Sequence, residues 1–175
     1  MSLGVLVIRL VVGLLLAGHG AQKLFGWFGG NGLSGTGELF ESIGLHHGRW
    51  MALTAGLAEV LGGTLFVLGL LTPLGAALLS AVMFTAIWTV HRSRGIWVTD
   101  GGPEYNIVLL AAAFGVTAIG AGTASLDHAF GVDAAGPAWA FGELAAGALG
   151  AATTLAFARL SMRRRFRSME PAGRY

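Results

Sequence analysis

Apolar runs of about the length of a membrane-spanning helix constrain this chain more than any other feature of its sequence. Five such runs cover approximately residues 3–23, 50–71, 72–91, 104–121 and 138–160, the fourth being the shortest. A helix needs about 20 consecutive, mostly apolar residues to cross a bilayer. Because every backbone polar group in lipid must be bonded internally, such runs are expected to be helices. The sequence therefore predicts an all-α integral membrane protein.

A shortage of charged residues agrees with this prediction. Charged residues make up 11% and hydrophobic residues 54% of the 175 residues, whereas a soluble domain carries about 25% charged residues. The formal net charge is +2, and the basic residues gather in short loops and in a C-terminal tail. This distribution does not indicate nucleic acid as a partner. We expect membrane lipid instead, and a multi-pass location in the cell membrane.

The chain contains no cysteine. This excludes a thiol or disulfide redox centre, thiolate-ligated iron–sulfur clusters and covalently attached c-type haem in this chain. Any redox chemistry would therefore depend on a bound cofactor or on a protein partner.

The connections between the runs carry glycine, proline and polar residues. A glycine-rich loop is predicted for residues 26–37, followed by a short amphipathic segment from Glu38 to Ile43. In the tight reversal "LLTPLG", Thr72 can cap the next helix and Pro73 suits its first position, so the third run is expected to begin at once. Glycines inside the runs favour close contact between helices in lipid.

Lysine and arginine of the loops lie on one side of the predicted bundle if all five runs cross the membrane. That side holds Lys23, Arg49, Arg92, Arg94 and the tail "RRRFR", and the other side holds the N-terminus, the Thr72 reversal and the Asp127 loop. The positive-inside rule predicts that the basic side is cytoplasmic. The tail is interpreted as a stop-transfer signal and an anchor to anionic lipid. If the fifth run does not cross, the tail moves to the opposite side.

A carboxylate inside the second run is the strongest candidate for a functional residue. Glu59 stands about nine residues into the run, roughly 13 Å deep at 1.5 Å per residue. A charge at that depth is costly, so this carboxyl must be neutral or paired. Gly56 and Gly63 share its helical face, so a neighbouring backbone or a ligand can approach closely.

Polar side chains form a stripe on the first run. Arg9, His19 and Lys23 fall within about 80° of one another on a helix that turns 100° per residue. We hypothesise that this stripe faces Glu59; the alternative for Arg9 is extension to the opposite membrane surface. The stretch "GHGAQK", which also contains Gln22, is either one wall of a site or an anchor at the membrane surface.

Two histidines on different runs, His19 and His91, are expected at comparable depth. They could bond to the head group of a quinone or relay protons. Ligation of a b-type haem through two imidazoles is less favoured, because no spacing motif supports it. They could also be a hydrogen-bonded pair at the interface. His46 and His47 lie in a loop and are weak metal candidates, so no metal site is predicted.

Several motifs occur in a characteristic order. They are "RLVVGLLLAGHGAQKLFGWFGG", "GTGELFESIGL", "AEVLGGTLFVLGLLTPLGA", a histidine closing the third run, "GGPEYNIVLLAAA" and "GAGTASLD". Over about residues 9–127 this series resembles the DoxX family. The resemblance implies a four-helix membrane bundle over residues 1–131, which leaves an additional C-terminal hydrophobic helix and basic tail over 132–175. It also implies an N-terminus inside the cell, opposite to the prediction from charge.

The resemblance also implies a setting and a set of residues. The family takes its name from a subunit associated with a membrane oxidoreductase that passes electrons from thiosulfate to quinone. Other members are linked to redox-stress complexes, and many have no defined activity. The family's pattern falls on His19, Gly20, Lys23, Glu59, Gly62, Gly63, His91, Glu104 and Asp127.

These lines lead to one functional hypothesis and one rival. The chain is predicted to be a small membrane subunit of an oxidoreductase system that binds a quinone-like or other small redox molecule near one interface. Glu59 and His19 would exchange protons or hydrogen bonds with the ligand, and a protein partner would supply electrons. Ligand contacts are predicted for Lys23, Gln22, Arg9, His91, Glu104 and Gly63. The rival is a non-catalytic membrane scaffold that anchors a soluble redox enzyme.

Overall fold

The structure, a computed structural model, describes the backbone of residues 2–169 and the side chains of residues 3–160. Its helices are α1 (Ser2–Phe25), α2 (Gly32–Ser42), α3 (Gly48–Leu68), α4 (Thr72–Ala86), α5 (Glu104–Ile119), α6 (Leu126–Ala129) and α7 (Pro137–Met169). Short 3-10 turns cover Trp27–Gly29 and Val98–Asp100, and a π-helical turn, Ile87–His91, continues α4. No strand occurs in residues 2–169, so the all-α prediction is confirmed.

Four helical segments are long and apolar enough to cross a membrane. They are Leu3–Phe25, Gly48–Leu68, Thr72–His91 and Pro137–Leu160. The predicted fourth run forms α5, which is apolar but has only 16 residues, fewer than a full span requires. The candidate spans therefore include the C-terminal helix and leave out α5, and the number of crossings stays a prediction.

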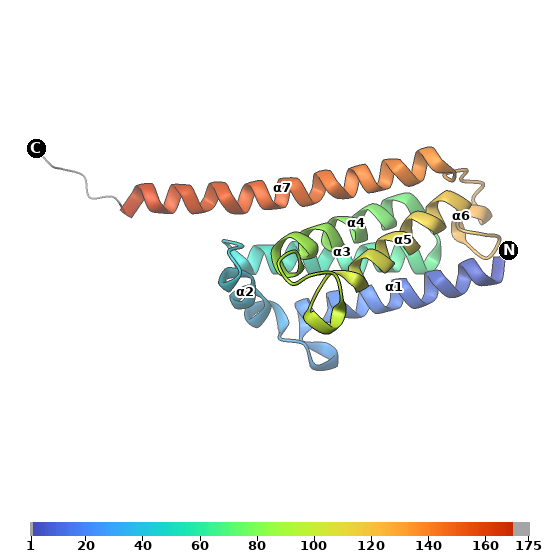
Figure 1. Ribbon diagram of the computed structural model, residues 1–175. Helices are drawn as coiled ribbons and strands as arrows, with labels where there is room; N and C mark the ends of the chain where they lie inside the picture. Colours follow the sequence, from blue (N-terminus) through green and yellow to red (C-terminus); the bar gives the residue numbers. More distant parts are fainter. Residues whose placement is uncertain (1, 170–175) are drawn as a thin grey trace, which may run out of the picture.

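The long helices lie side by side (Figure 1), with a main apolar core and a smaller buried cluster of Leu45, Met51 and Ala158. α3 packs on α1 and α4, and α4 packs in turn on α5 and α7. The core contains Leu16, Phe66, Leu79, Leu109 and Val116. Large apolar side chains also cover the outside of the bundle. In water such a surface would be an association site, whereas in lipid it is the ordinary outer face of a span.

Glycines bring α1 and α3 into backbone contact. A Cβ atom added to Gly63 would lie 2.5 Å from the carbonyl oxygen of Gly13, and one added to Gly20 would lie 2.6 Å from that of Gly56. Small residues permit such close helix packing in lipid. Gly63 therefore admits a neighbouring backbone, one of the two possibilities raised by the sequence.

The reversal between α3 and α4 is not capped as the sequence predicted. The Thr72 side chain makes no cap on its own helix; its hydroxyl donates to Oδ2 of Asp127, 2.7 Å away. Oδ1 and Oδ2 of Asp127 accept from the backbone N–H groups of Leu71 (2.7 Å) and Thr72 (3.0 Å). The cap is therefore a carboxylate from 55 residues further along the chain, which local spacing does not reveal.

The glycine-rich loop prediction is also wrong in part. Residues 26–37 contain the Trp27–Gly29 turn and the start of α2 at Gly32. A Cβ atom at Gly37 would lie 2.9 Å from the backbone nitrogen of Arg49. The glycines of α2 thus allow close contact with the start of α3 rather than an irregular loop.

The connections gather at two ends of the bundle. The N-terminus, the α3–α4 reversal and α6 lie at one end, and α2, the start of α3 and the far part of α7 lie at the other (Figure 1). This is the two-sided arrangement expected from the sequence. Which end faces the cytoplasm stays a prediction, and the side chains of the basic tail lie outside the described part.

Candidate functional site

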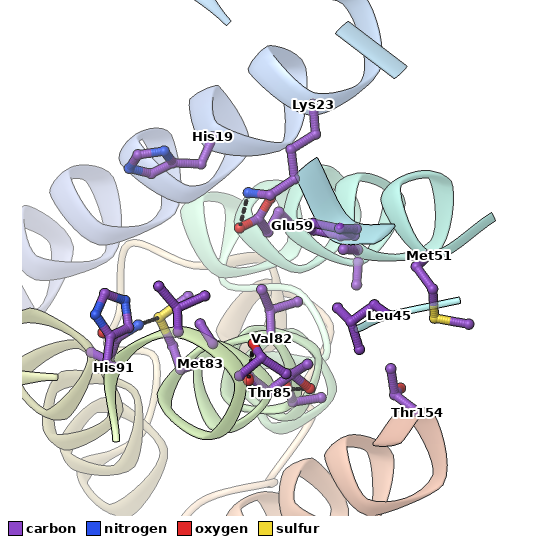
Figure 2. Close-up of a pocket in the computed structure, with 18 of the residues that line it drawn as sticks. His19, Lys23, Leu45, Met51, Glu59, Val82, Met83, Thr85, His91 and Thr154 are labelled. Carbon is purple, nitrogen blue, oxygen red and sulfur yellow. Dashed lines mark hydrogen bonds and ion pairs between the residues drawn. The ribbon is translucent and has the colours of Figure 1, made fainter. Parts of the chain in front are cut away.

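A cavity of about 680 Å³ lies within the end of the bundle near α2. Pockets of roughly 300–1,000 Å³ commonly hold small molecules. All five long helices and the segment after α2 contribute to its wall. α1 supplies His19 and Lys23, the segment after α2 supplies Leu45, and α3 supplies Met51, Thr54 and Glu59. Further wall residues are Met83 and Thr85 from α4, His91 from the turn after α4, Tyr105 and Asn106 from α5, and Thr153 and Thr154 from α7. Figure 2 shows ten of the lining residues with labels.

An ion pair joins α1 to α3 on the cavity wall. Nζ of Lys23 donates to both carboxylate oxygens of Glu59, at 2.5 and 2.7 Å. The Glu59 side chain is only 2% exposed, whereas that of Lys23 is 21% exposed. Lys23 reaches from the last turn of α1 toward Glu59 (Figure 2). The geometry meets the requirement that a buried carboxylate be paired.

His19 is held by a short chain of hydrogen bonds. Nε2 of Gln22 donates to the carbonyl oxygen of Phe28 (3.2 Å), and Nδ1 of His19 lies 2.9 Å from Oε1 of Gln22. Because that amide oxygen can only accept, Nδ1 carries the hydrogen and Nε2 is the lone-pair nitrogen of the neutral ring. Gln22 does not line the cavity; it orients His19 and holds the turn at Phe28.

His91 is held in the same tautomer from the opposite wall. Its Nδ1 lies 2.6 Å from the carbonyl oxygen of Gly101, an acceptor only, so Nδ1 carries a hydrogen and Nε2 is the lone-pair nitrogen whenever the ring is neutral. His91 ends the π-helical turn, and such wide turns often occur at functional sites. The structure thus brings both histidines and the Lys23–Glu59 pair to one cavity.

Glu104 lies beside the cavity rather than on its wall. Its Oε2 accepts from the backbone N–H of Val98 at 2.9 Å, and its own backbone N–H donates to Ile96 at 3.0 Å. These bonds close the loop that carries Gly101, the partner of His91. Glu104 therefore shapes the cavity mouth through the backbone.

Arg9 does not face Glu59, and that part of the stripe hypothesis is wrong. Its guanidinium donates to the carbonyl oxygens of Phe66, Val67, Ala121 and Ala124, at 2.6–3.0 Å. The side chain is 1% exposed, so it does not extend to the surface either. Arg9 binds the carbonyl end of α3, where helix geometry favours a cation, and fastens the 121–124 turn at the end opposite the cavity.

Threonines give the cavity an apolar wall. Thr54, Thr85, Thr89, Thr153 and Thr154 each donate the hydroxyl hydrogen to a carbonyl three or four residues earlier in their own helix. Because each threonine hydroxyl donates its hydrogen bond within the helix, the methyl group of each residue is available to contact a ligand. The polar chemistry is consequently concentrated at His19, Lys23, Glu59 and His91.

Several wall residues were not found by reading the sequence. Asn106 donates from Nδ2 to the sulfur of Met83 (3.3 Å) within the buried interior, and an amide inside an apolar run is a signal that could have been used. Thr153 and Thr154 come from α7, which the resemblance left outside the predicted bundle. Among the described residues, no group of three or more His, Asp or Glu side chains could hold a metal ion.

The sequence model of the family described as DoxX matches residues 4–92, half of the chain. The chain belongs to the DoxX family. It is also 29% identical over 126 residues to a Bacillus subtilis protein named "Putative oxidoreductase CatD". The aligned region covers 72% of this chain and 86% of that protein. No solved structure matches. With its apolar helices, this DoxX protein is a membrane protein.

Proposed function

We propose that this DoxX protein is a small membrane subunit of an oxidoreductase system and binds a quinone-like head group in the cavity near α2. One observation carries the proposal: a largely apolar cavity whose polar groups include an ion pair and two imidazoles, each with a hydrogen-bond partner at Nδ1. Ligand pockets are typically apolar, with a few placed polar groups. The name of the Bacillus subtilis relative supports the oxidoreductase setting.

The chemistry of the wall suits both states of a quinone. A quinone carbonyl accepts hydrogen bonds, for which the ammonium of Lys23 is a donor. A hydroquinone hydroxyl donates, for which Glu59 and the Nε2 atoms of His19 and His91 are acceptors. Reduction of the quinone consumes two electrons and two protons. The protons pass through these side chains, and a protein partner supplies the electrons.

Purification in mild detergent from native membranes tests the proposal. We expect quinone to copurify, and added quinone to quench fluorescence from Trp88 and Trp97, which stand next in sequence to the cavity-lining Thr89 and Val98. Glu59→Gln and Lys23→Met should lose this binding, whereas Glu38→Gln, an exposed carboxyl on α2, should keep it. An empty bundle that retains a stoichiometric protein partner would favour the scaffold alternative, and a haem absorbance would assign the histidines to iron.

A further inference from the structure

A second cavity adjoins the first between α3 and α7. Its volume is about 640 Å³, and its wall consists of His47, Trp50, Met51, Thr54, Thr153, Thr154 and Phe157. Met51, Thr54, Thr153 and Thr154 also line the first cavity. The two spaces are therefore neighbours with a shared wall of four residues.

This second space opens to the outside of the bundle. The side chains of Trp50 and Phe157 at its margin are 67% and 51% exposed. α7 packs chiefly on α4 and α5, and α3 packs chiefly on α1 and α4. The space between α3 and α7 therefore lies along α4, bounded by the buried cluster Leu45, Met51 and Ala158 and by the rings of His47 and Phe157, whose centroids are 6.0 Å apart. In a membrane protein such a lateral space faces lipid.

The combined space has a polar end and an apolar end. In Figure 2, His19 and His91 lie toward one end, while Leu45, Met51 and Thr154 lie toward the other, with the Lys23–Glu59 pair near the polar side. At the apolar end, the hydroxyl groups of Thr54, Thr153 and Thr154 donate to backbone carbonyl oxygens of their own helices. This distribution of polar and apolar wall residues matches an amphiphilic molecule with a compact polar head and a long apolar tail.

The depth of the gap fits the same kind of molecule. Trp50 stands near the start of α3, and tryptophan is enriched where bilayers meet water. Thr54 lies about 6 Å further along the helix, and Glu59 about 7 Å beyond it, at 1.5 Å per residue. A head group that enters from the bilayer beside Trp50 would therefore move about 13 Å along α3 to reach Glu59, and its tail would follow through the gap.

We infer that the α3–α7 gap is a lateral portal: the ligand is a tailed quinone that comes from the bilayer, and its tail remains between Met51, Thr54, Thr153 and Thr154. This inference rests on the proposed function and adds the class of ligand and its route. α7, outside residues 4–92 matched by the family, supplies one side of the portal.

The test compares two probes in lipid nanodiscs: a benzoquinone head group without a tail, and the same head group with a decyl tail. Thr153→Phe fills the portal, and Ala152→Phe places the same ring on the neighbouring exposed residue, which lines neither cavity. We expect Thr153→Phe to weaken binding of the tailed probe about tenfold or more, since tail burial is lost. The tail-less probe should bind to Ala152→Phe as it does to the unsubstituted protein, and Thr153→Phe should weaken its binding much less than that of the tailed probe.

A second measurement does not depend on a bulky substitution. Because the chain has no cysteine, Thr153→Cys and Ala152→Cys each carry a single thiol for maleimide labelling. The tailed probe should slow labelling of the cysteine at 153 and leave that at 152 unchanged, and the tail-less probe should protect neither.

The outcomes separate the two ideas. Equal binding of both probes in all variants, with no protection at position 153, would overturn the portal and leave the proposed function standing. Failure of the unsubstituted protein to bind either probe would overturn the proposed function and the portal with it. A bilayer phospholipid retained by the unsubstituted protein and absent from Thr153→Phe, without any effect on the tailed probe, would assign the gap to structural lipid and overturn the inference.

Discussion

Nζ of Lys23 on α1 lies 2.5 Å from Oε2 of Glu59 on α3, although 36 residues separate the two along the chain. Backbone contact at Gly20 and Gly56, close to the pair on each helix, fixes this separation. The pair is therefore as rigid as the α1–α3 contact. It offers a ligand one donor and one acceptor in a fixed arrangement.

Removing one partner of this pair should harm both folding and binding. Lys23→Met leaves a buried carboxylate without its cation, and we expect a loss of about 3–5 kcal/mol of stability. Replacing both residues with apolar ones, Lys23→Met with Glu59→Leu, should recover most of the stability and none of the quinone binding. Thermal unfolding in detergent and quinone titration measure the two effects. Binding by the double variant would show that the ligand does not use the pair.

Arg9 should matter for stability and not directly for the ligand. Arg9→Met removes the guanidinium from four buried or partly buried carbonyl groups, of which that of Phe66 keeps the Gly69 N–H as a donor at 3.2 Å. We expect this loss to cost on the order of 3 kcal/mol or more. Gly69→Ala should act similarly, since a Cβ there would lie 2.5 Å from the guanidinium. In protein that remains folded, quinone affinity should be unchanged. A selective loss of affinity without a change in melting temperature would return Arg9 to the ligand site.

The α1–α3 contact can be tested with two glycines of one helix. A Cβ at Gly20 would meet the Gly56 carbonyl, whereas one at Gly18 would meet nothing within 4 Å. We expect Gly20→Leu to separate the helices, lower the melting temperature and abolish quinone binding, because Lys23 moves away from Glu59. Gly18→Leu is the matched control and should resemble the unsubstituted protein. Similar behaviour of the two variants would contradict the packing account.

Glu143 should behave differently from Glu59. This α7 carboxyl is 3% exposed and accepts a hydrogen bond from the Ser80 hydroxyl at 2.9 Å. Among the described side chains the one ion pair is Lys23–Glu59, so Glu143 is expected to be uncharged, as an unpaired acid in the membrane must be. Glu143→Gln should therefore change stability by less than about 1 kcal/mol. A destabilisation as large as that of Lys23→Met would indicate a charged Glu143.

Membrane orientation can be read with reporters. Because the basic loop residues lie on one side, a reporter fused after Tyr175 should be cytoplasmic and one inserted near Asp133 should be external. The DoxX resemblance predicts the opposite face for the N-terminus. Cytoplasmic signals from both positions would show that α7 does not cross.

The sequence predicted the helices well and the polar contacts unevenly. Glu59 was found because a carboxyl deep in an apolar run needs a partner, and helical spacing then pointed to Lys23. Arg9 lies on the same helical face but donates to backbone carbonyl groups. Helical spacing cannot predict such a contact, because every helix end has free carbonyl groups. The Asp127 cap on α4 depends on a contact across 55 residues, beyond any local pattern.

Glu143 shows a different kind of omission. It sits in an apolar run just as Glu59 does, and the same rule would have selected it. Its partner, Ser80, is a small hydroxyl in another helix, and such residues are common in apolar runs. That Glu143 has a polar partner was therefore predictable, but the identity of that partner, Ser80 on α4, was not.

The position of α7 has a consequence for how this protein can diversify. The ion pair and both histidines lie within residues 4–92, which the family shares, whereas Thr153 and Thr154 lie beyond them. Exchange of the C-terminal helix would reshape the proposed portal while leaving the ion pair and both histidines in place. Under the portal proposal, substitutions at Thr153 and Thr154 would change which lipophilic molecules the protein accepts, provided that the α4–α7 contacts such as Ser80–Glu143 are kept.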